Sequence, residues 1–518
     1  MRSSRGWGLG LAGLLAALVG CGPEGPARAR FEDAPCAFEV PESRRVRCGW
    51  LHVPENRADP ASRSIRLPVA ILATTGLPLP DPVVLLGGGG PGGAVGLGRD
   101  DAAQHFEMHY WIQYSEVDLR FGRDLILLEQ RGAGRSDPEL DCPEDAALVA
   151  HDLGATWSLS ELVEGSRVEA RRCRRSLVDS GVDLRGYTTA ASAADAEDLR
   201  RALGIPSWNL YGTSYGTQIA LALLRDHPES VRSAVLDSPM PLDVAALEEL
   251  PAATERAFAA LFASCAAAPA CRESYPDLER RFDAGLQALS AAPRRVSVAN
   301  PAGGEIAVEI NAQRWIRCLL LGMYSADRWQ SLPVEIAAVA DARGGQLERC
   351  AADLVDESAD PLDSFSSGLF YAIECADEVP WSDVARARAA RERFPRFARY
   401  HDEIDASMRA SCEAWALPAA PAREQAPVVS DVPVLLLSGG WDPVTPPSWS
   451  RRAAATLSRG YVFEFAETPH GVLWQEPCAE RVAGAFLDAP DERPAPRCFD
   501  RERTPRLAQV VRSADRPR

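Results

Sequence analysis

The stretch WNLYGTSYGTQIALALL, residues 208–224, decides the fold. Its apolar first part predicts a buried strand, and the run after its second glycine predicts a buried helix. Ser214 stands at the junction, with Gly212 and Gly216 two residues away on either side. A serine at the tip of a sharp strand-to-helix turn needs small neighbours, because larger side chains would collide there. The stretch therefore predicts a nucleophile elbow with Ser214 at its tip.

Apolar runs with strand character recur on both sides of this turn and alternate with helical patterns. Such unbroken apolar strands are typical of a parallel sheet that is covered on both faces. Residues 46–54 and 64–73 predict an antiparallel hairpin at the edge of that sheet. The sequence therefore predicts the α/β class, an α/β-hydrolase fold with a mainly parallel twisted sheet. The runs are SIRLPVAIL, PVVLLGG, DLILLEQ, SAVLDSP, VPVLLLSGG and YVFEFAE.

The pattern changes to amphipathic helix between residues 243 and 415, and the strand series resumes only near Val432. An inserted, largely helical cap fits this order better than a tandem domain. The expected organisation is a signal peptide (1–21), a tether (22–35), a first core part (36–242), the cap (243–415), a second core part (416–500) and a polar tail (501–518).

Composition and the N-terminus bear on location and partners. The 518 residues carry a net charge of −17 and a pI near 5.0, which disfavours nucleic acid as a partner. Arg2 and Arg5 precede an apolar run that is too short to span a bilayer and is typical of an export signal. The run ends in a lipobox-like pattern at Cys21, which predicts lipidation there and anchoring in a bacterial cell envelope. Simple cleavage near residues 27–29, giving a secreted protein, is the alternative.

Twelve cysteines remain once Cys21 is set aside, an even number in a chain that is expected to reach an oxidising compartment. Disulfides are the natural interpretation, and a metal site is a weaker one, since no close pair has CxxC spacing. Sequence cannot fix the connectivity. Near neighbours suggest the pairs Cys36 with Cys48, Cys142 with Cys173, Cys265 with Cys271, Cys318 with Cys350, Cys375 with Cys412, and Cys478 with Cys498.

An elbow serine needs an acid and then a histidine later in the chain. Asp442 follows the strand VPVLLLSGG, and His470 follows the strand YVFEFAE, each at the expected carboxyl edge of the sheet. Asp237 at the end of SAVLD is the rival acid, and its alternative role is to bind loop amides. Thr445 is expected to shape the acid loop rather than to react.

A tetrahedral intermediate also needs N–H donors for its oxyanion. One is expected from Tyr215, directly after the serine. The second is expected from the glycine loop at residues 87–93, with Gly90 as the donor because Pro91 has no N–H. This loop lacks the lysine and hydroxyl residue of a phosphate-binding loop. Arg131 is expected to brace it.

Several motifs, in this order, resemble α/β-hydrolases of the secreted tripeptidyl and prolyl aminopeptidase type, with their characteristic C-terminal segment. Gly88 and Glu129 stand where many relatives of the proline-iminopeptidase branch have histidine and aspartate. The resemblance implies an exopeptidase in which Glu374, Asp377 and Glu378 hold the free α-ammonium of a peptide; a solvated acidic turn is the alternative. The motifs are CGWLHVPEN, GGGPGG, EQRGAGRSDP, YGTSYGTQIA, VLDSP, AIECADE and LLLSGGWDPVTPP.

The leading hypothesis is thus an exported serine exopeptidase that acts on peptides and needs no metal or organic cofactor. A carboxylesterase is the alternative on the same fold, since fold and triad do not choose between amide and ester. A non-catalytic peptide-binding lipoprotein is the remote one. The sequence makes no prediction of oligomeric state.

Overall fold

The computed structural model describes residues 29–97, 122–142, 153–300, 303–341, 346–359 and 365–498. The signal peptide, Cys21 and the polar tail that the sequence predicts lie outside these residues. In the part of the chain that the structure describes, no helix combines the length and the apolar character that crossing a membrane requires.

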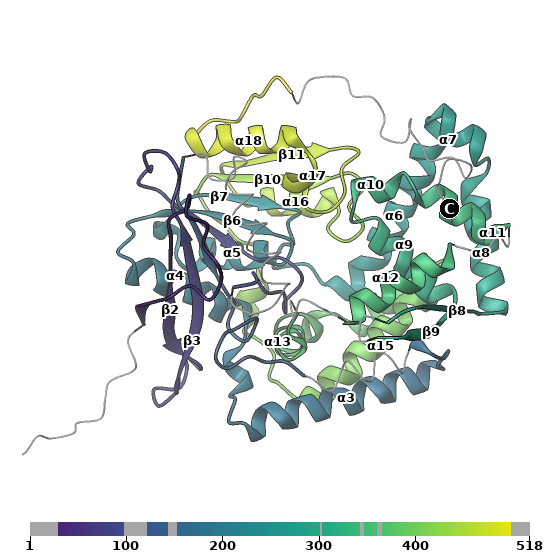
Figure 1. The fold of residues 1–518 in the computed structure, drawn as a ribbon, viewed down its shortest axis with the longest axis horizontal. Coiled ribbons are helices and arrows are strands. Elements are labelled where there is room, and N and C mark those ends of the chain that lie inside the picture. Colours follow the sequence, from purple (N-terminus) through teal and green to yellow (C-terminus); the bar gives the residue numbers. More distant parts are fainter. Residues whose placement is uncertain are drawn as a thin grey trace, which may run out of the picture.

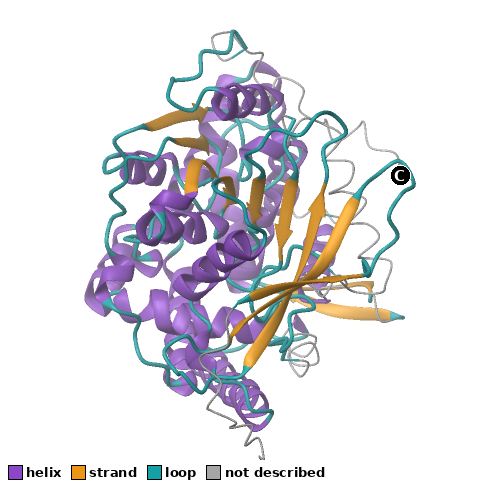
Figure 2. Ribbon diagram, turned by 90° about the vertical axis from the view of Figure 1, so that its left-hand side faces the viewer, coloured by secondary structure: helices purple, strands orange, loops and turns teal. Residues whose placement is uncertain are grey.

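One twisted sheet of nine strands forms the core, and Figure 2 shows its strands fanning across the molecule. Its order is β1-β2-β3-β5-β4-β6-β7-β10-β11, antiparallel from β1 to β5 and parallel from β5 to β11. The sequence prediction of a mainly parallel sheet is therefore confirmed. The strands are β1 (Arg30–Ala34), β2 (Val46–Pro54), β3 (Ser64–Leu72), β4 (Val83–Leu86), β5 (Leu125–Leu128), β6 (Trp208–Thr213), β7 (Val231–Asp237), β10 (Val434–Gly439) and β11 (Gly460–Phe465).

Alternate residues of each central strand enter different apolar cores on the two faces of the sheet. Leu210 packs on one face with α4 (Thr189–Ala202) and α5 (Gly216–Asp226). Its neighbour Tyr211 packs on the other with α17 (Val472–Gln475) and α18 (Pro477–Asp488). Helices on both faces explain why the parallel strands are almost continuously apolar.

The N-terminal edge of the sheet differs from the prediction in one respect. Strand β1 lies outside the expected β2–β3 hairpin and includes residues that were expected to be a tether. The Phe31 ring fits against Gly49, where an added β-carbon would come within 2.4 Å of it. The missing side chain of Gly49 makes room for this ring. A single aromatic residue in a polar stretch gives too little pattern for a strand prediction.

Residues 246–415, which lie between β7 and β10 in the chain, form an inserted segment, seen to the right of the sheet in Figure 1. A separate apolar core holds much of it together. Its elements are α6 (Ala246–Ala267), α7 (Pro269–Ser274), α8 (Leu278–Ala291), the hairpin β8 (Arg294–Ala299) and β9 (Glu305–Ile310), α9 (Ala312–Gly322), α10 (Ala326–Trp329), α11 (Leu332–Ala340), α12 (Leu347–Ala359), α13 (Ser367–Ile373), a π-helical turn (Glu374–Glu378), a 3-10 turn (Val379–Trp381), α14 (Val384–Arg393) and α15 (Ala398–Trp415).

Helix α3 (Leu159–Asp179), which precedes β6 in the chain, packs beside this inserted segment. The Arg174 Nε donates to the Trp415 carbonyl at the end of α15 (2.7 Å), and Ser411 on α15 donates to the Ser166 carbonyl (3.4 Å). Helix α3, which lies outside residues 243–415, therefore packs against the last helix of the inserted segment.

The twelve cysteines in the described residues form six disulfides, and these are the near-neighbour pairs that the sequence suggests. They join Cys36–Cys48, Cys142–Cys173, Cys265–Cys271, Cys318–Cys350, Cys375–Cys412 and Cys478–Cys498. Three of the six lie wholly within the inserted segment.

Candidate active site

Ser214 sits at the tip of the turn between β6 and α5 with a φ angle of +54°. This left-handed backbone is strained for a residue with a side chain and is typical of functional turns. An added β-carbon on Gly212 would come within 2.6 Å of the Gly216 carbonyl oxygen, and one on Gly216 within 2.0 Å of the Leu86 oxygen. Both glycines are therefore required for the turn to close against β4.

Asp442 and His470 meet at the carboxyl ends of β10 and β11. The His470 Nδ1 lies 2.8 Å from an Asp442 carboxylate oxygen, and Asp442 is fully buried. The same carboxylate accepts hydrogen bonds from the Val444 N–H (2.9 Å), the Thr445 N–H (2.8 Å) and the Thr445 hydroxyl (2.6 Å). Thr445 thus shapes the acid loop, as the sequence predicts.

Mutual stabilisation sets the charge state of this pair. Burial would raise the pKa of Asp442, but the charge and hydrogen bond of His470 and the bonds from Thr445 outweigh it, and the pKa lies below its usual value. Burial would lower the pKa of His470, but the Asp442 charge and hydrogen bond, with a contribution from Asp237, raise it above its usual value. An imidazolium formed during a reaction would be stabilised in the same way.

The end of β7 links the serine to the histidine loop. The Ser214 N–H donates to the Asp237 carbonyl (2.9 Å), and the Gly471 N–H donates to the Ser238 hydroxyl (2.9 Å). Among the described residues the Ser214 hydroxyl makes no hydrogen bond to the imidazole. Contacts of this kind commonly tighten only when a substrate binds.

Asp237, the rival acid, contacts the loop after His470 rather than the imidazole. Its carboxylate accepts the N–H groups of Val472 (2.8 Å) and Leu473 (2.9 Å) and lies 3.1 Å from the Ser238 hydroxyl. Burial raises the pKa of Asp237 to about 6 despite these donors. Its contacts match the alternative role that the sequence allows, which is to bind loop amides.

The glycine loop after β4 passes directly over the serine. An added β-carbon on Gly88 would lie 2.9 Å from the Thr213 carbonyl oxygen and 3.4 Å from the Ser214 β-carbon. Gly90, with a φ of +80°, lies beside Phe365. The donor roles of the Gly90 and Tyr215 N–H groups stay predictions.

Gln130 and Glu129, rather than Arg131, hold the end of this loop and the residues that follow it. The buried Glu129 carboxylate accepts the N–H groups of Val95 (2.7 Å) and Leu97 (3.2 Å), and the Gln130 side chain donates to the Gly93 carbonyl (2.9 Å). One acidic and one amide side chain directly after a buried strand were the available signal for this role.

The prediction for Arg131 was wrong. Its guanidinium binds the Asp195 carboxylate (2.7 and 2.6 Å) and the carbonyls of Glu55 (2.6 Å) and Gly186 (2.5 Å). A fully buried arginine needs carboxylate and carbonyl acceptors around it. Here these acceptors come from distant segments, which the residues next to Arg131 in the sequence do not indicate.

The three acidic candidates lie on or at the end of the π-helical turn that follows α13. Asp377 and Glu378 are each 4% exposed, and Glu374 is half-buried. Asp377 accepts the Thr189 N–H (2.8 Å), and Glu378 accepts the Gln218 side-chain amide (2.7 Å). Within the residues that the structure describes, one buried oxygen of each has no hydrogen-bond partner. The alternative of a solvated acidic turn is therefore wrong for Asp377 and Glu378.

No ion pair joins these three carboxylates to a cation within the described ranges. Burial raises the pKa of Glu374 and of Asp377 to about 7 each, and the pKa of Glu378 rises further above its usual value. Burial raises the pKa of Tyr215, the residue after Ser214, and the charges of these carboxylates raise it further. The Tyr215 hydroxyl lies 3.0 Å from the Thr189 hydroxyl. The cluster thus lies close to the elbow and carries uncompensated acid groups.

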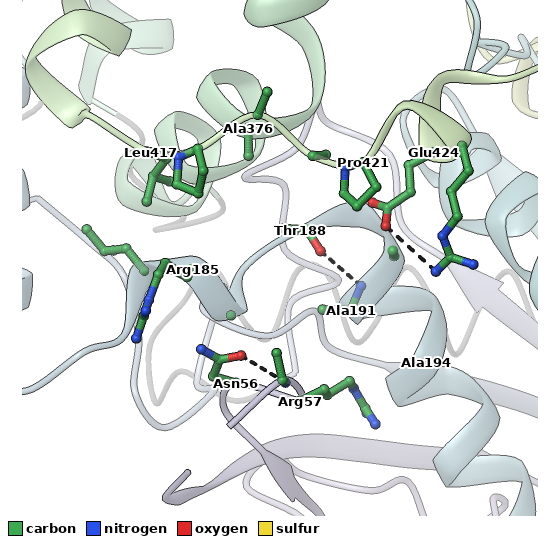
Figure 3. Close-up of a pocket in the computed structure, with 18 of the residues that line it drawn as sticks. Asn56, Arg57, Arg185, Thr188, Ala191, Ala194, Ala376, Leu417, Pro421 and Glu424 are labelled. Carbon is green, nitrogen blue, oxygen red and sulfur yellow. Dashed lines mark hydrogen bonds and ion pairs between the residues drawn. The ribbon is translucent and has the colours of Figure 1, made fainter. Parts of the chain in front are cut away.

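A pocket of about 680 Å³ includes Ala376 of the π-helical turn in its lining (Figure 3). Ala191 and Ala194 of α4 lie on one wall, and residues 417–421 lie on the facing one. Arg57 at its rim is paired with Asp195 and Asp198. Neither Ser214 nor the acidic candidates line this pocket in the described part of the chain.

One group in the described ranges has the spacing to hold a metal ion: Glu197, His227 and Glu229. Glu197 is already paired with Arg200 (2.8 Å) and Arg201 (2.6 Å). His227 follows the C-terminal end of α5, whereas Ser214 precedes its N-terminal end. This group is therefore separate from the candidate active site.

Comparisons with known proteins agree with this geometry. Residues 81–275 match the alpha/beta hydrolase fold family, and residues 398–497 match the TAP-like protein family. The chain is 26% identical over 505 residues to serine protease Hip1 of Mycobacterium tuberculosis, covering 92% of this chain and 94% of that protein.

Two further relatives carry different activity names. Carboxylesterase B of M. tuberculosis is 28% identical over 430 residues, which is 79% of this chain and 77% of that protein. Tripeptidyl aminopeptidase of Streptomyces lividans is 29% identical over 221 residues, which is 41% of this chain and 38% of that protein. The sheet, the elbow and these matches show that the chain is a serine hydrolase with the α/β-hydrolase fold and a tripeptidyl-aminopeptidase-like (TAP-like) segment over residues 398–497.

Proposed function

We propose that this serine hydrolase is an exopeptidase that releases short pieces from the N-terminus of peptides. The Ser214 hydroxyl attacks the scissile carbonyl, and its proton passes to His470, which Asp442 orients through Nδ1. The N–H groups of Tyr215 and Gly90 hold the oxyanion. His470 then protonates the leaving amine, and water hydrolyses the acyl-enzyme on Ser214.

The observation that carries the proposal is the buried acidic cluster beside the elbow. Burying a carboxylate without a cationic partner is costly, so such groups are retained where something binds them. The free α-ammonium of a peptide supplies the missing charge and up to three donors to the unpaired oxygens of Asp377 and Glu378. A substrate with an acylated N-terminus supplies neither.

The position of the cluster favours products longer than one residue. Gln218, which binds Glu378, lies four residues beyond Ser214, and four residues rise about 6 Å along a helix. An extended peptide spans about 3.5 Å per residue. This distance corresponds to about two extended residues, so we expect released pieces of at least two residues.

The test compares tripeptidyl anilides with a free and with an acetylated N-terminus. We expect kcat/KM to fall about 10- to 100-fold on acetylation, because a hydrogen bond to a charged group contributes about 1.5–3 kcal/mol. Sequencing the products of a defined peptide then gives the length released per cut. Equal rates for both substrates would contradict amine anchoring.

A carboxylesterase is the second candidate, and the similarity to a protein named carboxylesterase B favours it. Short acyl esters lack the ammonium, so their hydrolysis should not depend on the acidic cluster. Esters turned over faster than every free-amine peptide, with no effect of Glu374→Gln, would favour this candidate.

We also propose that the chain is exported and lipid-anchored at Cys21. The short apolar run before Cys21 and the six disulfides support an oxidising destination. Cys21→Ser should release the protein from the membrane fraction of the host. A protein that stays reduced and cytoplasmic in its own host would contradict the proposal.

A further inference from the structure

The loop that presents Asp442 is held from the inserted segment. Arg256, on α6, donates from one guanidinium nitrogen to the Gly440 carbonyl (2.6 Å) and from the other to the Asp442 carbonyl. These two carbonyls flank Trp441. A single side chain therefore fixes both ends of the short segment that precedes and includes the acid.

Arg256 has no carboxylate partner in the described ranges, although it is partly buried. Burial lowers its pKa, and the charge of Asp442 only partly offsets this. Its Nε is buried and finds no hydrogen-bond partner among the residues described. Removing an arginine from water without a carboxylate partner costs free energy. The hydrogen bonds of Arg256 to the two loop carbonyls offset part of this cost.

Trp441 adds a second attachment to the same segment. Its indole stacks on that of Trp329, with ring centroids 4.0 Å apart and planes at 8°, and its Nε1 donates to the Ser264 hydroxyl (3.2 Å). Ser264 lies on α6, two turns after Arg256. The side chain thus belongs to the apolar core of the inserted segment, while the backbone lies in the turn directly after β10.

We propose that Arg256 is a positioning residue for the reaction, acting through Asp442. This inference rests on the proposed role of Asp442. The guanidinium fork aligns two carbonyls and so sets the direction of the carboxylate toward His470 Nδ1. Because the fork sits on α6, the acid is aligned only when the inserted segment is docked against the sheet.

The chemistry of the side chain makes the proposal specific. Arginine presents its donors in a planar fork that satisfies two acceptors at once, whereas lysine is a compact point charge. Lysine at this position would keep the charge but could not hold both carbonyls in the same plane. A misplacement of about 1 Å in a catalytic group can cost about 10²-fold in rate.

The experiment compares Arg256→Lys and Arg256→Gln with the matched control Arg314→Gln. Arg314 also lies in the inserted segment and donates to two backbone carbonyls, those of Glu309 (2.6 Å) and Leu153 (3.2 Å). We expect kcat to fall about 10- to 100-fold in Arg256→Gln and less in Arg256→Lys, with KM nearly unchanged. The control should keep wild-type kcat per folded molecule.

A pH profile separates positioning from general stability. Asp442 raises the pKa of His470, and Asp237 adds to this. The Tyr324 ring makes a T-shaped contact with the imidazole, with the ring centroids 5.1 Å apart. Loosening the Asp442 contact removes the main raising influence, so the acid limb of kcat/KM should move to lower pH in both Arg256 variants. An unmoved limb, or a kcat loss that the Arg314 control shares, would overturn the inference.

A double-mutant cycle distinguishes this inference from the assignment of the acid itself. If Arg256 acts through Asp442, Arg256→Gln should add little further loss in an Asp442→Ala background. Independent, fully additive losses would overturn the positioning role. An Asp442→Ala enzyme with wild-type kcat would instead overturn the proposed triad.

Discussion

Two groups of buried carboxylates lie near the elbow, and they differ in how their oxygens are satisfied. Asp442 binds an imidazole, two amides and a hydroxyl, and its pKa is lowered. Asp377 and Glu378 each have one buried oxygen without a hydrogen-bond partner in the described part of the chain, and burial raises their pKa values. The difference teaches that burial alone does not define a catalytic acid. Complete internal pairing suits a group that must stay charged, and incomplete pairing suits one that receives its partner from a ligand.

The largest expected effect comes from breaking the fully paired group. Asp442→Asn keeps the shape but replaces an acceptor with a donor, which disfavours the reactive tautomer of His470. We expect kcat to fall by about 10⁴-fold, the loss that the same change causes in a serine protease with a Ser-His-Asp triad. Steady-state kinetics on an anilide substrate would measure it. A loss of less than tenfold would show that another group orients the imidazole.

Neutralising the incompletely paired group should change binding rather than chemistry. The triple variant Glu374→Gln, Asp377→Asn and Glu378→Gln should raise KM for free-amine peptides about 10- to 100-fold. Acyl esters and acetylated peptides should be turned over at the wild-type rate. An equal loss on all substrates would mean that the cluster supports the fold and not the ammonium.

Glu129 is an intermediate case, a buried carboxylate bound by loop amides. Its pKa is raised by burial although these amides lower it. Glu129→Gln removes one acceptor from the loop that passes over Ser214, and we expect kcat to fall about tenfold. Unchanged kcat would show that Gln130 and the glycines hold the loop without it.

The smallest effect concerns stability against pH. The raised pKa values of Glu374 and Asp377, about 7 each, mean that folding favours their protonated forms. The contribution of these two groups to the free energy of unfolding is fully present below about pH 4 and is lost as the pH rises toward 7. Thermal unfolding followed between pH 5 and 8 should show a decline that is flatter in the triple variant. Parallel curves for both proteins would contradict the raised pKa values.

Local patterns allowed the sheet and the elbow to be predicted from sequence. The spacing of Gly212, Ser214 and Gly216 and the apolar strands are features that neighbouring residues determine. Asp442 and His470 could be placed because each follows a recognisable strand, and the structure brings them to 2.8 Å.

Long-range partners could not be predicted in the same way. Arg131 and Arg256 are polar residues whose carbonyl and carboxylate partners come from distant segments. In strand β1, the aromatic ring of Phe31 fits against Gly49, which belongs to another strand. In each case the three-dimensional meeting of two segments determines the role, and periodicity along one segment gives no signal for it.

The central claim is that Ser214 is the nucleophile of a working triad, and active-site labelling tests it most directly. A fluorophosphonate applied to the native, disulfide-intact protein, followed by peptide mapping, should modify Ser214 stoichiometrically. The label should vanish in Ser214→Ala and slow sharply in Asp442→Asn. Absence of labelling in a folded wild-type protein, or labelling that persists in Ser214→Ala, would contradict the account and favour a non-catalytic binding protein.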